Sequence, residues 1–223
     1  MKAFVNLSIS VCLKSACGLS VWLPLPATEA QFKDALKGIL SLNGNDFEIA
    51  GYANTVPGLP NSLLMIEDIR FANYLAARLE KIPPHQVNKL VALMESDLRF
   101  NTLTEFIDFT FNDGCITLIP DVRCAEDLGR YYLYESGQVK MPDTLKAYVG
   151  PTMFGINAAE AEGGTFTSRG YLSFSGKKWK EVVAQKGVPD RYTLPVAKPD
   201  GPDERRAPDF EPIPDTCGDA DGQ

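Results

Sequence analysis

Near its start, the chain alternates between apolar and polar or small residues. The apolar positions are Val5, Leu7, Ile9, Val11 and Leu13. A period of two places all of these side chains on one face of a β-strand. A secretion signal is the alternative for an apolar N-terminus, but its central part is continuously apolar and this run is not. The pattern therefore predicts a first strand with one buried face.

A small α/β unit is predicted over residues 1–60. A second apolar stretch, Leu19–Leu25, follows the first strand. Thr28 is suited to cap a helix from Glu29 to about Leu42, because its hydroxyl can accept a free N–H of the first turn. The stretch Phe47–Tyr52 then predicts another strand. Strands and a helix in this order are typical of a small layered domain.

Residues 61–111 change to a helical period and predict a small helical bundle. Pro83 and Pro84 interrupt the pattern, because proline cannot continue a helix. Two shorter helical runs follow, His85–Glu95 and Leu103–Phe111. The predicted organisation is thus an N-terminal α/β domain followed by a central helical domain.

Residues 112–186 predict a third small domain of the α+β type. Its expected elements are a strand, two helices and two strands: Cys115–Ile119, Asp121–Gly137, Pro142–Val149, Gly164–Phe166 and Tyr171–Phe174. Residues 187–223 are rich in Pro and Asp, and from about Lys198 onward we expect a disordered tail. The fold class predicted for the whole chain is α+β.

The stretch from Asp121 to Gly137 contains both an apolar stripe and an acidic start. Leu128, Tyr131, Tyr132 and Glu135 recur at helical spacing. Glu126 and Asp127 fall in the first turn, where carboxylates interact favourably with the helix dipole. Gly137 is a suitable residue to end the helix. On pattern alone, this is an amphipathic helix with a solvated acidic end.

Composition indicates a globular, acidic protein. The 223 residues are 44% hydrophobic and 23% charged, and the net charge is −7. Phosphates repel a protein of this charge, so direct binding to nucleic acid is not expected. A positively charged protein is the better partner.

Cysteine and histidine content argues against a metal site, a cofactor or a common type of catalytic centre. The chain has five cysteines without a C-x-x-C pair and a single histidine, His85. A zinc cage and a Ser–His or Cys–His nucleophile are therefore not expected. A hydrolase with paired carboxylates remains a remote alternative. Free thiols indicate a reducing cytoplasm, and no apolar run approaches the ~20 residues of a membrane span.

Negative charge is concentrated between Glu95 and Ser136, where nine acidic residues face three basic ones. B-DNA presents a phosphate about every 3.4 Å along a strand. A helix with one acid per turn presents a carboxylate about every 5.4 Å. Such a surface can imitate a phosphate track and occupy a basic groove. The candidate residues are Glu95, Asp97, Glu105, Asp108, Asp113, Asp121, Glu126, Asp127 and Glu135.

Several short motifs occur in an order that resembles the ArdA family of antirestriction proteins, from about Gly18 to Phe174. The motifs are Arg130, Tyr131, Tyr132, Glu135 and Gly137; then Pro142, Leu145 and Tyr148; then Phe154 and Gly155; then Gly164, Thr165 and Phe166. Upstream, Trp22–Thr28 and Phe47–Tyr52 are also similar to the family. The long C-terminal tail sets the chain apart as a divergent member.

The resemblance implies an elongated, three-domain protein that is no enzyme. Members of the family imitate bent B-form DNA, bind the DNA-recognition core of type I restriction–modification enzymes and are carried by mobile elements. The implied location is the cytoplasm of the bacterial host. Carried over to this chain, Asp121, Glu126, Asp127 and Glu135 fall in the segment that resembles the antirestriction motif.

The resemblance also implies a homodimer built through the C-terminal domain. Apolar residues near the motif are the candidate contacts: Tyr131, Tyr134, Tyr148, Met153 and Phe154. The alternative for these side chains is packing inside their own small domain.

Charge balance leaves a second function open. With 22 basic against 29 acidic residues, and a basic cluster at Lys177, Lys178 and Lys180, the chain is less acidic than a strong DNA mimic. A less acidic surface suits a target recognised by shape. The alternative is an inhibitor of another nucleic-acid-dependent defence nuclease, such as a CRISPR effector, or a protein-interaction scaffold.

Overall fold

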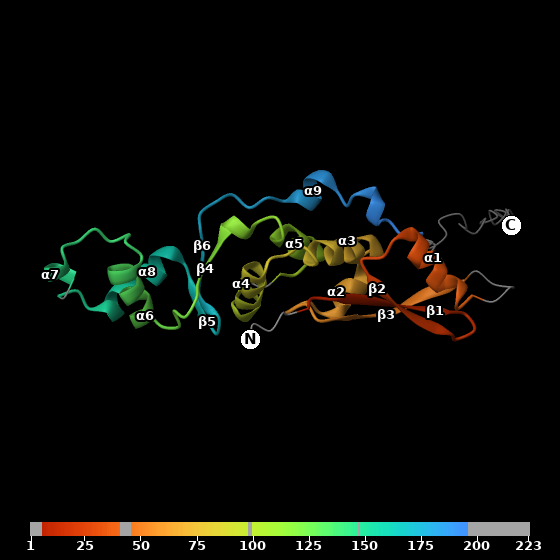
Figure 1. The fold of residues 1–223 in the computed structure, drawn as a ribbon, viewed down its shortest axis with the longest axis horizontal. Coiled ribbons are helices and arrows are strands. Elements are labelled where there is room, and N and C mark those ends of the chain that lie inside the picture. Colours follow the sequence, from red (N-terminus) through yellow and green to blue (C-terminus); the bar gives the residue numbers. More distant parts are fainter. Residues whose placement is uncertain (1–5, 41–45, 98–99, 147, 196–223) are drawn as a thin grey trace, which may run out of the picture.

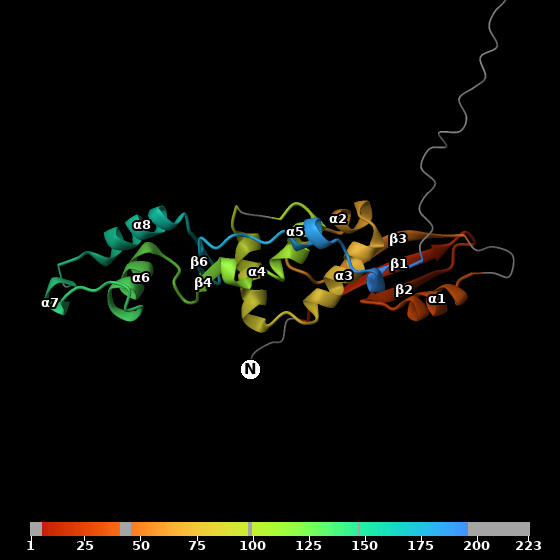
Figure 2. The same cartoon turned by 90° about the horizontal axis from the view of Figure 1, so that it is seen from above.

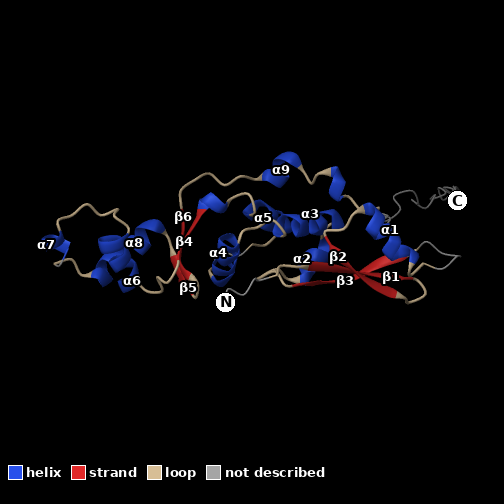
Figure 3. Cartoon of the chain, in the orientation of Figure 1, coloured by secondary structure: helices blue, strands red, loops and turns tan. Residues whose placement is uncertain are grey.

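The computed structural model describes residues 6–40, 46–97, 100–146 and 148–195. It shows an elongated α+β molecule (Figure 1). A small antiparallel sheet and its helix lie at one end, helices occupy the middle, and a second small sheet leads into further helices at the other end (Figure 3).

The N-terminal sheet has the strand order β2-β1-β3 and is antiparallel. Its strands are β1 (Ile9–Ser15), β2 (Ser20–Leu25) and β3 (Phe47–Asn54). The predicted buried face is confirmed, because Ile9, Val11 and Leu13 are all buried, although Cys12 on the other face is also buried. β1 begins later than the pattern suggested, and Val5 lies outside the described residues.

Helix α1 (Glu29–Lys37) begins where the sequence predicted. The Thr28 hydroxyl accepts the Gln31 N–H at 3.3 Å, and the Gln31 side chain accepts the Thr28 N–H at 2.8 Å. This reciprocal pair satisfies two free donors of the first turn. The helix ends at Lys37 rather than near residue 42, and the turn expected at residues 43–45 lies outside the described residues.

The middle of the molecule consists of α2 (Asn61–Ile66), α3 (Ile69–Leu79), α4 (Pro84–Glu95) and α5 (Leu103–Phe109). The prolines do separate α3 from α4, with Pro84 in the first turn of α4. Asp68 adds a break that the pattern did not reveal, because its side chain accepts the Arg70 N–H and caps α3.

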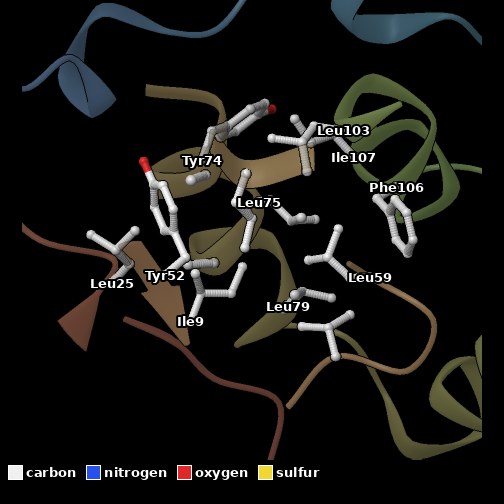
Figure 4. Packing of buried hydrophobic residues seen from close by; sticks show 14 of the residues in the cluster. Ile9, Leu25, Tyr52, Leu59, Tyr74, Leu75, Leu79, Leu103, Phe106 and Ile107 are labelled. Carbon is white, nitrogen blue, oxygen red and sulfur yellow. The ribbon is translucent and has the colours of Figure 1, made fainter. Parts of the chain in front are cut away.

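One cluster of buried residues extends from the N-terminal sheet into these helices. Tyr52 and Leu25 of the sheet face Leu75 of α3, and Phe106 of α5 lies further along the same core (Figure 4). The N-terminal sheet and the central helices are therefore held together by a shared hydrophobic interior.

We call residues 113–174 the distal lobe. Its elements are the 3-10 turn η1 (Asp113–Cys115), β4 (Ile116–Ile119), α6 (Ala125–Arg130), the π-helix η2 (Tyr131–Glu135), α7 (Asp143–Lys146), α8 (Pro151–Glu162), β5 (Thr165–Thr167) and β6 (Gly170–Phe174). The strand order is β4-β6-β5. Ile116 and Leu172 belong to the central core, whereas Ile119 and Tyr171 belong to a second core with α6. The sheet thus separates two hydrophobic interiors.

The sequence predictions for the distal helices need correction. The helix expected over Pro142–Val149 is shorter, since α7 covers only Asp143–Lys146. Helix α8 was not predicted at all. It begins with Pro151 in its first turn and ends at Glu162, and the φ of +60° at the following Gly163 is a left-handed conformation suited to glycine.

Residues 175–195 form a segment that we call the strap. It contains α9 (Val182–Lys186) and η3 (Asp190–Tyr192), and it runs from β6 back along α5 and α3 towards the N-terminal sheet (Figures 1 and 2). The sequence placed residues from 187 onward in a tail, but Leu194 is buried in the central core. The disorder expected from Lys198 onward concerns residues outside the described part of the chain.

Candidate functional site

A hollow of about 480 Å³ lies between the end of β4 and the acidic helix. Asp121, Asp127 and Glu135 contribute three carboxylates to its lining, against the single guanidinium of Arg130. The other lining residues are Thr117, Leu118, Ile119, Pro120, Val122 and Tyr131. The hollow therefore joins negative charge to an apolar and aromatic floor, a chemistry that suits a cationic side chain.

Asp121 is placed by an unusual backbone conformation. Its φ is +66°, in the left-handed region, and it follows Pro120 at the end of β4. Aspartate tolerates this conformation better than most residues with a side chain. Asp121 is exposed and lines the hollow.

Asp127 is held by hydrogen bonds at the start of α6. A hydrogen bond with the Cys124 side chain, and the Arg123 N–H at 3.2 Å, lower the pKa of the Asp127 carboxyl. A carboxylate with a lowered pKa carries its full negative charge at neutral pH. The prediction that Asp127 lies in the first turn of the helix is confirmed.

Glu126 forms an ion pair with Arg130 one turn later. The two contacts from the guanidinium to Glu126 Oε1 are 2.7 and 3.1 Å. Both side chains are largely exposed, so the pair adds little stability. It does, however, offset part of the negative charge beside the hollow.

The acidic helix is not the regular helix expected from Asp121 to Gly137. It begins at Ala125, and its last turn, Tyr131–Glu135, is a π-helix in which the Ser136 N–H donates to the Tyr131 carbonyl at 2.8 Å. The wider turn places Leu133 beside Tyr132 in the interior and leaves Glu135 exposed at the hollow. Single π-turns are rare and occur often at functional sites.

A hydrogen bond connects this helix to α8, and no sequence pattern indicated it. The Tyr132 hydroxyl donates to the Glu162 carboxylate of α8 at 2.6 Å. Burial, together with this carboxylate, raises the pKa of Tyr132, so the phenol stays protonated. Tyr132 and Glu162 are thirty positions apart in sequence, and neither lies in a pattern that would connect them.

Asp108 does not belong to an exposed acidic surface, contrary to expectation. It is 3% exposed, and its carboxylate accepts the Val183 N–H of the strap at 3.0 Å. Burial raises the pKa of Asp108, against the effect of the Val183 and Val182 N–H groups. Asp108 therefore has a structural role, because its carboxylate binds the main chain at the start of α9.

Among the other predicted acidic residues, Glu95, Glu105 and Asp113 are engaged by neighbouring groups. Glu95 accepts the Ser168 N–H and hydroxyl at 2.8 and 2.7 Å. The Glu105 side chain caps α5. Asp113 forms an ion pair with Lys89 at 2.8 Å and a hydrogen bond with the single histidine, His85, at 3.1 Å.

Asp97 is exposed just after α4, and the described part of the chain offers it no ion-pair partner. The structure thus gathers Asp121, Asp127 and Glu135 around one hollow, with Glu126 on the same helix. It does not bring Asp108 to that surface.

The aromatic and Met candidates for a dimer contact divide into two groups. Tyr134, Tyr148 and Met153 are 54, 88 and 62% exposed. Tyr131 and Phe154 instead pack against the distal core. Two further exposed apolar side chains, Leu145 of α7 and Ile156 of α8, were not among these candidates, and no sequence pattern indicated the helix that carries Ile156.

Within the ranges described, no helix is long and apolar enough to cross a membrane. Over the same residues, His, Cys, Asp and Glu side chains do not gather in threes that could hold a metal ion.

Comparison with known proteins shows which family the chain resembles. No curated protein sequence matches the chain. The sequence profile described as "Antirestriction protein (ArdA)" matches residues 17–173, which include β2 and β3 of the N-terminal sheet, the central helices and nearly the whole distal lobe. This match covers well over half of the chain, and the protein therefore belongs to the ArdA family of antirestriction proteins.

Proposed function

We propose that this antirestriction protein imitates DNA and inhibits type I restriction–modification enzymes by occupying their DNA-binding groove. The observation that carries the proposal is the grouping of Asp121, Asp127 and Glu135 around one hollow, in the segment that resembles the family's antirestriction motif. No chemical step is required of the inhibitor, which acts by binding alone.

Placement of the carboxylates suits competition with phosphates. Hydrogen bonds to Cys124 and Arg123 hold Asp127, while Asp121 lies in a left-handed turn and Glu135 in a π-turn. Groups that are already held in place lose little entropy on binding. Lysine and arginine side chains that line a DNA-binding groove would meet these carboxylates in place of phosphates.

The elongated shape supports the same proposal. The distal lobe, the central helices and the N-terminal sheet follow one another along a single long axis (Figure 1). A long, narrow body can lie in a groove built for a duplex, which a spherical protein of the same mass would not enter.

A homodimer would extend this surface, and we propose that it forms through the distal lobe. Tyr134, Tyr148 and Met153 leave apolar surface exposed there, and such residues are enriched in the cores of interfaces. A two-fold axis through this region would place the two acidic hollows on one doubled surface.

The direct test uses a purified type I enzyme and DNA that carries its unmodified recognition site. The protein should slow both cleavage and methylation, and additional DNA should restore both activities. Full cleavage at low salt with an excess of the protein, across several such enzymes, would rule the proposal out.

One observation favours the second candidate, an inhibitor of a different nucleic-acid-dependent nuclease. Glu126 and Asp113 are neutralised by ion pairs and Asp108 is buried, so the free negative charge is smaller than the acid count suggests. A target that is recognised more by shape than by charge would still bind a surface with less negative charge. Affinity capture from a bacterial host lysate separates the candidates, since recovery of restriction subunits alone would count against this one.

A further inference from the structure

The strap begins where the family match ends. The match stops at residue 173, and the strap covers residues 175–195. It leaves β6 of the distal lobe and reaches the N-terminal sheet after passing α5 and α3 (Figures 1 and 2). This segment therefore lies outside the part of the chain that matches the family.

Buried side chains of α5 and of the turn that follows it bind the main chain of the strap. Asn112, which is 2% exposed, donates to the Lys180 carbonyl and accepts the Lys180 N–H, both at 2.9 Å. Asp108 accepts the Val183 N–H at 3.0 Å. Cys115 makes a weaker contact, from its thiol to the Lys178 carbonyl at 3.6 Å.

The far end of the strap is bound in the same manner. Asn73 of α3 is 0% exposed, and its side-chain amide donates to the Tyr192 carbonyl at 3.0 Å. The same side chain accepts the Ala27 N–H at 2.7 Å and donates to the Ala27 carbonyl at 3.0 Å. One buried asparagine thus connects the strap to the chain between β2 and α1.

Apolar contacts supplement these hydrogen bonds. Val183 and Leu194 are buried in the central core, and Trp179 packs against it. The Tyr192 ring lies 4.9 Å from the Tyr74 ring. By contrast, Lys177, Lys178 and Lys180 have exposed side chains, although the main chain of Lys180 is bound. The basic cluster is therefore not what attaches the strap.

We propose that α3, α5 and the turn at Asn112–Cys115 bind the strap through its main chain, and that the bound strap holds the distal lobe fixed relative to the N-terminal sheet. The physical reason is that Asn73, Asp108 and Asn112 are buried polar groups that need partners, and the strap supplies those partners. Because the strap is continuous with β6 and bound near Ala27, it connects both ends of the molecule. The inference does not depend on which enzyme the protein inhibits.

The test compares three variants of the full-length chain. Lys180→Pro removes the N–H that Asn112 accepts. Lys178→Pro is the matched control, because it loses the same charge and the Lys178 N–H has no hydrogen-bond partner among the described residues. Lys180→Ala removes the side chain and keeps the N–H. Circular dichroism confirms that each variant is folded.

Hydrogen–deuterium exchange of the strap peptides is the first measurement. Lys180→Pro should raise the exchange rate of the Val183 amide by about tenfold or more, since a lost hydrogen bond to a buried group opens the segment locally. Lys178→Pro and Lys180→Ala should change it by less than about threefold. An unchanged rate in Lys180→Pro would overturn main-chain recognition, as would an equally large increase in Lys180→Ala.

The second measurement follows the relative position of the two ends. Cys17 lies between β1 and β2 of the N-terminal sheet, and Cys124 lies just before α6 in the distal lobe. Both are exposed, whereas Cys12 and Cys115 are buried. With the fifth cysteine of the sequence, Cys217, replaced by Ser, spin labels on Cys17 and Cys124 report one distance. Its distribution should be narrow in the parent and in Lys178→Pro, and broader in Lys180→Pro. A released strap with an unchanged narrow distribution would overturn the bracing role.

Discussion

Gly155 of α8 lies directly against Gly129 of α6. A Cβ atom built on Gly155 would lie 2.9 Å from the Gly129 nitrogen and 1.8 Å from the Ala125 carbonyl oxygen. A Cβ built on Gly129 would in turn lie 1.8 Å from the Pro151 carbonyl oxygen. The two helices therefore touch through their backbones, and this contact positions the helix that carries Glu126 and Asp127.

Substitution of Gly155 should therefore destabilise the distal lobe. In Gly155→Ala the new methyl group meets main-chain atoms that cannot move aside, so we expect a loss of about 1–3 kcal/mol or more in the free energy of unfolding. Gly150→Ala is the control, because a Cβ there meets no atom within 4 Å. Urea denaturation measures both, and equal stabilities for the two variants would contradict the packing described.

Loss of the Tyr132 hydroxyl should weaken the attachment of the acidic helix to α8. Tyr132→Phe removes the 2.6 Å hydrogen bond to Glu162 and keeps the ring. We expect a decrease of about 1–2 kcal/mol in the free energy of unfolding. Tyr131→Phe provides the comparison, since the described residues offer no hydrogen bond to that hydroxyl. If both variants unfold at the same urea concentration as the parent, the bond contributes nothing.

The Asp113 ion pair predicts a change of stability with pH. Burial alone would raise the pKa of Asp113, but the hydrogen bonds from Lys89 and His85 outweigh it and lower the pKa. The unfolded chain then binds this proton at a higher pH than the folded chain, near the usual value of about 3.9. The stabilisation is therefore present above about pH 4 and is lost as the pH falls through the lowered pKa.

Thermal melts of the parent and of Asp113→Asn measure this effect. The difference in melting temperature should be largest near neutral pH and should shrink as the pH falls to about 3. Asp97→Asn, at an exposed position, should show no such dependence. If the difference in melting temperature grew as the pH fell, the lowered pKa of Asp113 would be refuted.

The proposed dimer can be tested on the exposed apolar side chains of the distal lobe. Met153→Asp places a charge where a second copy would pack, and light scattering at micromolar concentration should shift from twice 24.5 kDa towards 24.5 kDa. Ile66→Asp is the control, since Ile66 is 77% exposed on α2, away from the distal lobe. If the parent protein is already monomeric, the proposed dimer is refuted.

Local patterns were sufficient to predict many of the elements. Alternation identified β1, Thr28 marked the start of α1, and Pro83 and Pro84 separated α3 from α4, because each of these signals acts within a few residues of its own position. The acidic positions of α6 were also predicted, since the first turn of a helix favours carboxylates.

Features that depend on distant contacts were not predicted. Helix α8 is apolar on more than one side and its only buried residue is Gly155, so its sequence has no clear amphipathic period. Asp108 resembles any surface acid until the strap, seventy-five positions later, is seen to bind it. The π-turn that follows α6 also went unpredicted, because helical spacing alone does not distinguish a π-turn from a regular one.

The central claim is that the carboxylates around the hollow replace DNA phosphates. The most direct measurement is competition against a fluorescent DNA duplex for the methyltransferase core of a type I enzyme, followed by anisotropy over a range of salt concentrations. The parent should displace DNA, and displacement should weaken as salt increases. The double variant Asp121→Asn, Glu135→Gln should compete at least about tenfold less well, whereas Glu29→Gln, Asp34→Asn, which removes two charges from α1, should compete like the parent. Absence of displacement at low salt, or equal competition by both double variants, would contradict the proposal.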